Sequence, residues 1–119
     1  MSLDTISKRL VALLKKKEFL IAQQELFAPS VISLEPDFHP NPQTAGLTSV
    51  LQKEKEFLGA IMHWEAFDVS DPVLSKFHFC IRMYSKIVMQ NDQRVEVDEL
   101  IMYEVQNGKI VKEQFFYLA

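Results

Sequence analysis

The dipeptide Asn107-Gly108 constrains this chain more than any other feature, because it separates two runs of strand-forming residues. Asn and Gly both tolerate a positive φ angle, and such a pair favours a two-residue type I′ turn between antiparallel strands. The turn sets the register of a hairpin over residues 95–118. An uninterrupted register pairs Gln106 with Lys109, Val105 with Ile110, Tyr103 with Lys112, Ile101 with Gln114, and Glu99 with Phe116.

The two faces of this predicted hairpin differ in character, because side chains alternate between faces along a strand. The face that we expect to meet the core carries Val97, Glu99, Ile101, Tyr103, Val105, Ile110, Lys112, Gln114, Phe116 and Leu118. The opposite face carries Glu96, Asp98, Leu100, Met102, Glu104, Val111, Glu113, Phe115 and Tyr117. That second face holds enough apolar side chains to predict a cover, and a second copy of the chain is the simplest one.

Length and composition favour one domain covering residues 1–119, with hydrophobic residues making up 48% of the chain. The net charge of −3 and the lack of a Lys/Arg cluster argue against a nucleic-acid partner. The sequence shows neither a secretory signal nor an apolar run long enough to span a bilayer. A single cysteine, Cys80, rules out an internal disulfide. We therefore expect a cytoplasmic protein that does not enter membranes.

The pattern along the chain predicts an α+β fold. Residues 3–27 lack Gly and Pro and predict two helices, and residues 47–62 predict a third. Strands are expected over residues 31–35 and 64–69, with a long, bent or bulged strand over residues 74–89. Residues 36–45 hold three prolines and predict a loop. Three helices on one face of a strongly curved, mostly antiparallel sheet would enclose a conical, apolar cavity.

Several segments, in this order and spacing, resemble the SnoaL-like branch of the nuclear-transport-factor-2-like superfamily. They are residues 32–36 (ISLEP), Gly46 with Val50 and Lys53, residues 70–73 (SDPV), Phe77 to Phe79, residues 99–105 (ELIMYEV), and residues 108–117 with their Gly, Lys, Ile, Val, Glu and aromatic positions. The resemblance implies a cone-shaped fold of three helices and a curved sheet of six strands or fewer, a pocket between them, and often a dimer through the outer sheet face. The superfamily includes polyketide cyclases, ketosteroid isomerase, limonene epoxide hydrolase, dehydratases and binding domains without catalysis.

The cyclases of this branch use an acid with a nearby histidine. The sheet position at which such an acid is often found holds Ile101 here, and Gln114 replaces the neighbouring aromatic residue. The last two strands contain no histidine. The sequence therefore departs from the cyclase pattern where that chemistry would be carried.

Glu99 is the leading candidate for catalysis, because it lies among Val97, Ile101 and Phe116 on the apolar face. Burial would raise the pKa of its carboxyl group and suit it to proton transfer next to a carbonyl group. The structural alternatives are a Glu99 bonded to Tyr103, Lys112 or a backbone N–H, and a Glu99 at the exposed end of its strand. Glu35, before the proline-rich loop, is a second candidate that could meet Glu99 across the cavity mouth; a solvated strand end is its alternative.

Aromatic and polar residues facing the predicted cavity are candidates for ligand binding, although aromatic residues in a small fold are commonly plain core. They are Trp64, Phe79, Ile101, Tyr103, Gln114 and Phe116. The three histidines lack metal-binding spacing, so we expect neither a metal nor a cofactor.

Two functions remain open from the sequence. The first is a pocket for a small apolar or aromatic organic molecule, with isomerase- or cyclase-type acid–base chemistry at Glu99. The second is a ligand-binding or dimerisation module of the same fold without catalysis.

Overall fold

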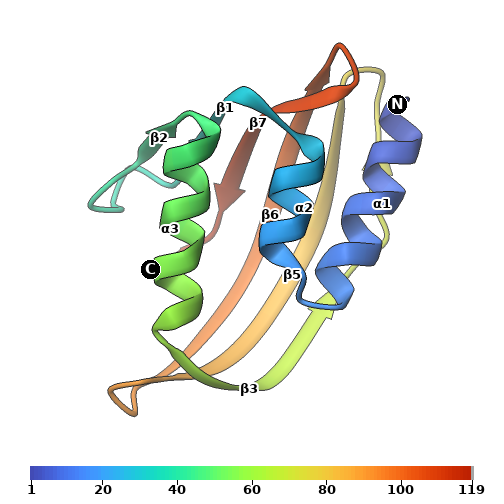
Figure 1. The fold of residues 1–119 in the computed structure, drawn as a ribbon. Helices are drawn as coiled ribbons and strands as arrows, with labels where there is room; N and C mark the ends of the chain where they lie inside the picture. Colours follow the sequence, from blue (N-terminus) through green and yellow to red (C-terminus); the bar gives the residue numbers. More distant parts are fainter. Residues whose placement is uncertain (119) are drawn as a thin grey trace.

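A computed structural model describes residues 1–118, which form three helices and a seven-stranded sheet (Figure 1). The helices are α1 (Leu3–Lys15), α2 (Phe19–Leu26) and α3 (Leu47–Gly59). The strands are β1 (Phe27–Leu34), β2 (Gln43–Ala45), β3 (Ile61–Val69), β4 (Val73–Leu74), β5 (His78–Met89), β6 (Arg94–Gln106) and β7 (Lys109–Phe116). The sheet order is β2-β1-β7-β6-β5-β3, and the short β4 pairs with β5.

The sheet is curved, and the three helices cover its concave face (Figure 1). Every strand pairing is antiparallel except that between β1 and β7. The predicted α+β, cone-shaped architecture is therefore confirmed. The sheet has seven strands, not six or fewer as expected, because two short strands were not predicted as separate elements. β2 lies inside the stretch expected to be a loop, and β4 is divided from β5 at the start of the single strand expected over residues 74–89.

Local sequence determines where α1 and α3 begin, and apolar side chains anchor α1 and α2 to the core. The side chain of Ser2 caps α1 by accepting a hydrogen bond from the backbone N–H of Thr5 at 3.1 Å. Gly46 precedes α3 with a φ of +91°, a value that glycine adopts without a steric penalty. The apolar side chains of α1 and α2 are buried against the sheet and include Ile6, Leu10, Leu13, Leu14, Phe19, Ala22 and Leu26.

The turn at the end of β6 is the predicted one. Asn107 and Gly108 both have positive φ angles, 51° and 75°. Gln106 pairs with Lys109 and Val105 with Ile110, as predicted. One pair further on, however, Glu104 lies opposite Lys112, so the register shifts and Val111 has no partner of its own. This extra residue is a β-bulge.

The bulge makes the predicted faces of β7 wrong beyond Ile110, because one inserted residue moves every later side chain to the other face. Tyr103 pairs with Glu113 and Ile101 with Phe115, and these residues share the concave face of the sheet. The predictions for β6 itself hold. Ile101, Tyr103 and Val105 are buried, whereas Leu100 and Met102 are exposed on the convex face.

Replacing Gly108 with Ala should destabilise the protein by about 1 kcal/mol, because Ala resists a φ of +75°. A Cβ atom there would also lie 3.2 Å from the backbone nitrogen of Met1. Urea unfolding measures the change. Gly59→Ala is the control, because no atom lies within 4 Å of its Cβ position. It should stabilise α3 slightly, and equal effects of the two substitutions would contradict the argument.

Candidate functional site

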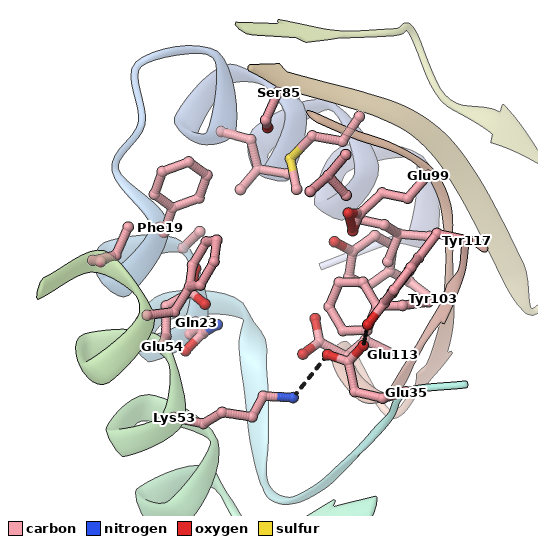
Figure 2. Close-up of a pocket in the computed structure, with 18 of the residues that line it drawn as sticks. Phe19, Gln23, Glu35, Lys53, Glu54, Ser85, Glu99, Tyr103, Glu113 and Tyr117 are labelled. Atoms are coloured by element: carbon pink, nitrogen blue, oxygen red, sulfur yellow. Dashed lines mark hydrogen bonds and ion pairs between the residues drawn. The ribbon is translucent and has the colours of Figure 1, made fainter. Parts of the chain in front are cut away.

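A cavity of about 260 Å³ lies between the helices and the concave face of the sheet (Figure 2). Much of the cavity wall is formed by apolar side chains, which come from all three helices and from β3, β5, β6 and β7. These apolar lining residues are Leu10, Leu14, Phe19, Phe57, Leu58, Trp64, Met83, Val97, Ile101 and Phe115. Phe19 stacks on Trp64 with ring centroids 5.7 Å apart, which fixes the aromatic part of the wall.

A hydrogen-bonded network occupies one side of the cavity, where β1, α3 and β7 meet. Lys53 Nζ on α3 donates to Ser33 Oγ at 3.1 Å and to Glu35 Oε1 at 3.3 Å. Ser33 Oγ in turn donates to Glu113 Oε1 at 2.8 Å. The hydroxyl of Tyr117 donates to the other oxygen of Glu35 at 2.7 Å. Lys53 thus links two carboxyl groups, and its charge offsets part of theirs.

Glu113 is the most deeply buried acid of this network, with 4% of its surface exposed. Burial raises the pKa of its carboxyl group to about 7, and the hydrogen bond from Ser33 opposes that rise. Its position on the concave face follows from the bulge at Val111. Without that extra residue, Glu113 would point to solvent on the convex face.

Glu99 and Glu54 differ from the network because, within residues 1–118, no side chain donates a hydrogen bond to either carboxyl group. Burial, together with the neighbouring charges of Glu35 and Glu113, raises the pKa of Glu99 to about 8. Burial also raises the pKa of Glu54 to about 7, with Lys53 opposing the rise. Both carboxyl groups line the cavity, Glu54 from the helical wall and Glu99 from the sheet (Figure 2).

Two neutral polar side chains complete the wall. Tyr103 is 3% exposed, and burial raises the pKa of its phenol well above the usual value, so that it stays protonated at neutral pH. Gln23 on α2 is 8% exposed, and its Oε1 atom has no hydrogen-bond partner among the described residues. A buried polar atom without a partner is unusual in a folded protein.

The structure brings five of the eight predicted site residues to the cavity wall: Glu35, Trp64, Glu99, Ile101 and Tyr103. Phe79 lies deeper, is 1% exposed, and stacks on Tyr103 at 5.0 Å, so it supports the wall without lining it. Gln114 and Phe116 were placed on the wrong face, because the bulge at Val111 turns them to the convex side.

Neither Tyr103 nor Lys112 is hydrogen-bonded to Glu99 within residues 1–118, and Glu99 is half-buried in the cavity wall instead of lying at an exposed strand end. Lys112 lies opposite Glu104, and no side-chain hydrogen bond reaches Glu99 within residues 1–118. Glu35 and Glu99 both line the cavity, but no hydrogen bond joins them within residues 1–118, so their meeting across the cavity mouth stays a prediction. The carboxyl group of Glu35 accepts hydrogen bonds from Lys53 and Tyr117, and its negative charge raises the pKa of Glu99.

Sequence reasoning missed Lys53, Glu54, Glu113, Phe115 and Tyr117 as wall residues. The first two stand side by side on a helix, and helical periodicity assigned them no role. The last three were given to the wrong face by the uninterrupted register. The adjacent apolar residues Ile110 and Val111 were the available signal, because strict alternation breaks there.

Residues 1–118 contain no group of three or more His, Cys, Asp or Glu side chains arranged to hold a metal ion. Nor does this part of the chain contain a helix of the length and apolar character needed to cross a membrane.

Three helices on the concave face of a curved, mostly antiparallel sheet, with a cavity between them, form the α+β fold that the resemblance to nuclear-transport-factor-2-like proteins implies. The chain belongs to the SnoaL-like domain family, whose model matches residues 1–117.

Solved structures give the same fold. A candidate SnoaL-like polyketide cyclase from Mesorhizobium loti superposes with a TM-score of 0.88 at 24% identity, covering 98% of this chain and 100% of that one. A protein of unknown function with a cystatin-like fold from Xanthomonas campestris gives 0.80 at 16% identity, covering 100% and 92%. AclR, a candidate hydroxylase from Streptomyces galilaeus, gives 0.72 at 12% identity, covering 97% and 87%. The comparison with curated proteins finds no match.

The raised pKa of Glu113 predicts that the protein loses stability as pH rises. The folded state binds the proton more tightly than the unfolded chain, so the contribution of Glu113 is full below about pH 4.5 and is lost as pH rises through about 7. Between pH 5 and 8, the free energy of unfolding of Glu113→Gln should gain about 1–3 kcal/mol relative to wild type. Urea unfolding at each pH measures this difference.

Glu56→Gln is the matched control, because Glu56 is exposed on α3. Its free energy of unfolding should follow the wild-type pH dependence. If the free energy of unfolding of Glu113→Gln showed the wild-type pH dependence as well, the prediction would be wrong. Glu113 would then be ionised between pH 5 and 8, as a buried carboxylate within the network.

Proposed function

We propose that this chain binds a small, largely apolar organic molecule in the cavity and exchanges a proton with it through Glu99. The observation that carries the proposal is a carboxyl group that faces the cavity, has no hydrogen-bonding side chain, and has a pKa of about 8. Buried carboxyl groups of small domains are normally paired. One that faces an apolar cavity unpaired is suited to act on a bound molecule.

The reaction that this geometry supports is proton transfer at a carbon next to a carbonyl group. Ionised Glu99 removes the proton, the C–H electron pair forms a C=C bond, and the carbonyl π electrons move to oxygen. Tyr103 lines the same wall as a protonated phenol and can donate a hydrogen bond to that oxygen. If Glu99 exchanges the abstracted proton with solvent before it reprotonates the same carbon, the hydrogen of that carbon is exchanged. In a substrate with a C=C bond next to the acidic carbon, the enolate is conjugated, and return of the proton to the far carbon of that bond completes an isomerisation.

The exchange of deuterium into 2-tetralone in D₂O tests this proposal, since this bicyclic ketone is mostly apolar and enolises at the carbons beside its carbonyl. The protein should accelerate the exchange, and the rate should rise with pH through about 8, as Glu99 ionises. Glu99→Gln should slow the catalysed exchange by about 10²–10⁴-fold, the usual contribution of a general base. NMR of the ketone follows the exchange.

Glu96→Gln is the control, because Glu96 lies on the same strand but is exposed on the convex face. Binding of 2-tetralone without exchange would favour the alternative, a ligand-binding module without catalysis. If the protein neither bound 2-tetralone and other bicyclic ketones nor accelerated their exchange, that result would contradict the proposed function.

We also propose a homodimer through the convex face of the sheet. Leu100 and Phe116 are cross-strand neighbours there, and 53% and 46% of their surfaces are exposed. Met102, two residues along β6, extends the patch. Apolar side chains gathered on a sheet face are usually covered, and a twofold axis lets one patch cover itself. We also propose a cytoplasmic location, as expected from the sequence.

Size-exclusion chromatography with light scattering tests the dimer. The wild-type protein should show twice the mass of one chain, and Leu100→Glu should show the mass of a single chain because a carboxylate would be buried in the interface. Ile21→Glu is the control, since Ile21 is equally exposed but lies on α2. A wild-type mass of one chain at high concentration would rule the dimer out.

A further inference from the structure

The helical wall of the cavity presents two polar groups that the proposed proton transfer does not use. Gln23 on α2 and Glu54 on α3 both line the cavity and project from the side opposite Glu99 and Tyr103 (Figure 2). Gln23 Oε1 has no partner among the described residues, and no side chain there donates to Glu54. Both are left to a group that residues 1–118 do not supply.

The surroundings of these two groups are aromatic. Phe19 lies one helical turn before Gln23 on α2, and Phe57 lies three residues after Glu54 on α3, so that each aromatic ring shares a helix face with its polar neighbour. Both rings line the cavity. Acceptor oxygens beside aromatic rings match an organic ammonium group, which donates hydrogen bonds and is attracted to ring faces.

The balance of charged groups around the cavity also favours a cationic ligand. The described residues place four carboxyl groups around it and one ammonium group, that of Lys53, which is committed to Ser33 and Glu35. The titratable or charged groups that face Glu54 across the cavity and beside it are Glu35, His39, Lys53, Glu99, Tyr103, Glu113 and Tyr117. With every carboxyl group ionised, acids exceed bases by three, and a cationic ligand would lower that imbalance.

We infer that the cavity takes an organic amine, an otherwise apolar molecule whose ammonium group is held by Glu54 and Gln23 on the helical wall. This inference rests on the proposed function and adds the class of ligand to it. The apolar body of the ligand then fills the space lined by Phe19 and Trp64. Its opposite side faces Glu99, so recognition and proton transfer use different walls.

Binding of an amine should be coupled to protons. Burial keeps part of the Glu54 population protonated near pH 7, since its pKa is about 7. An ammonium group binds the carboxylate, so it lowers the pKa of Glu54 and releases a proton on binding. The affinity for an amine should therefore rise from pH 6 to pH 8, whereas that for a neutral analogue should not.

Isothermal titration with 2-naphthylmethylamine and 2-naphthylmethanol tests the inference, because the two probes differ only in the charged group. The amine should bind at least tenfold more tightly at pH 8. Titrations in phosphate and Tris at pH 7 should show proton release with the amine only. Glu54→Gln should remove the preference for the amine and reduce the proton release, the remainder coming from Glu99 and Glu113, while the affinity for the alcohol stays within about twofold.

Two further variants make the test specific. Glu56→Gln removes the same charge from the exposed side of α3 and should leave the preference for the amine unchanged. Glu54→Asp keeps the charge and should restore most of that preference. Because Gln23→Leu removes the uncharged acceptor alone, it should weaken the amine several-fold without altering the proton release.

Equal affinity for the two probes, or a preference that survives Glu54→Gln, would overturn the amine assignment. Binding of the alcohol would in that case still support a pocket for neutral molecules, and the 2-tetralone exchange would decide on Glu99 independently. If neither naphthyl probe bound while 2-tetralone exchanged, the amine assignment would fail and the proposed function would stand.

Discussion

One extra residue in the last strand decides what the cavity contains. The turn at Asn107-Gly108 fixes the start of the hairpin, and the bulge at Val111 then turns the rest of β7 over. As a result, Glu113 and Phe115 face the helices, and Gln114 and Phe116 face away. The buried Ser33–Glu113 hydrogen bond depends on that inversion. A register without the bulge would place Lys112 and Gln114 in the cavity instead of Glu113 and Phe115, and it would give a more acidic outer face.

Local chemistry explains how far sequence reasoning succeeded. The turn was predictable because only a few residues tolerate positive φ, and the concave face of β6 was predictable because alternation holds along its whole length. The face of β7 was not predictable in this way. A bulge costs little in local terms, and it was selected here by burial of side chains that belong to distant parts of the chain.

The same limit applies to the site. Glu99 could be found because an acid among apolar residues of one strand is a pattern within a short window. Glu54 could not, because its carboxyl group lies next to Lys53 on a helix and looks like one of many exposed charges. Only the packing of α3 over the sheet gives Glu54 a different environment from Glu56, two residues away. Three-dimensional context therefore separates two glutamates that the sequence presents alike.

The parallel pairing of β1 with β7 affects the order in which parts of the chain fold. Ser33 and Glu113, which hydrogen-bond across this pairing, are 80 residues apart in the chain. Contacts over such separations are slow to form, because a long loop must close before they yield any stabilisation. The β5–β6 hairpin has short connections and can form early. The β6–β7 hairpin, closed by its two-residue turn, can form early as well. The acidic side of the cavity is therefore expected to close last, when β1 pairs with β7, and until then its carboxyl groups remain hydrated and ordinary in their acidity.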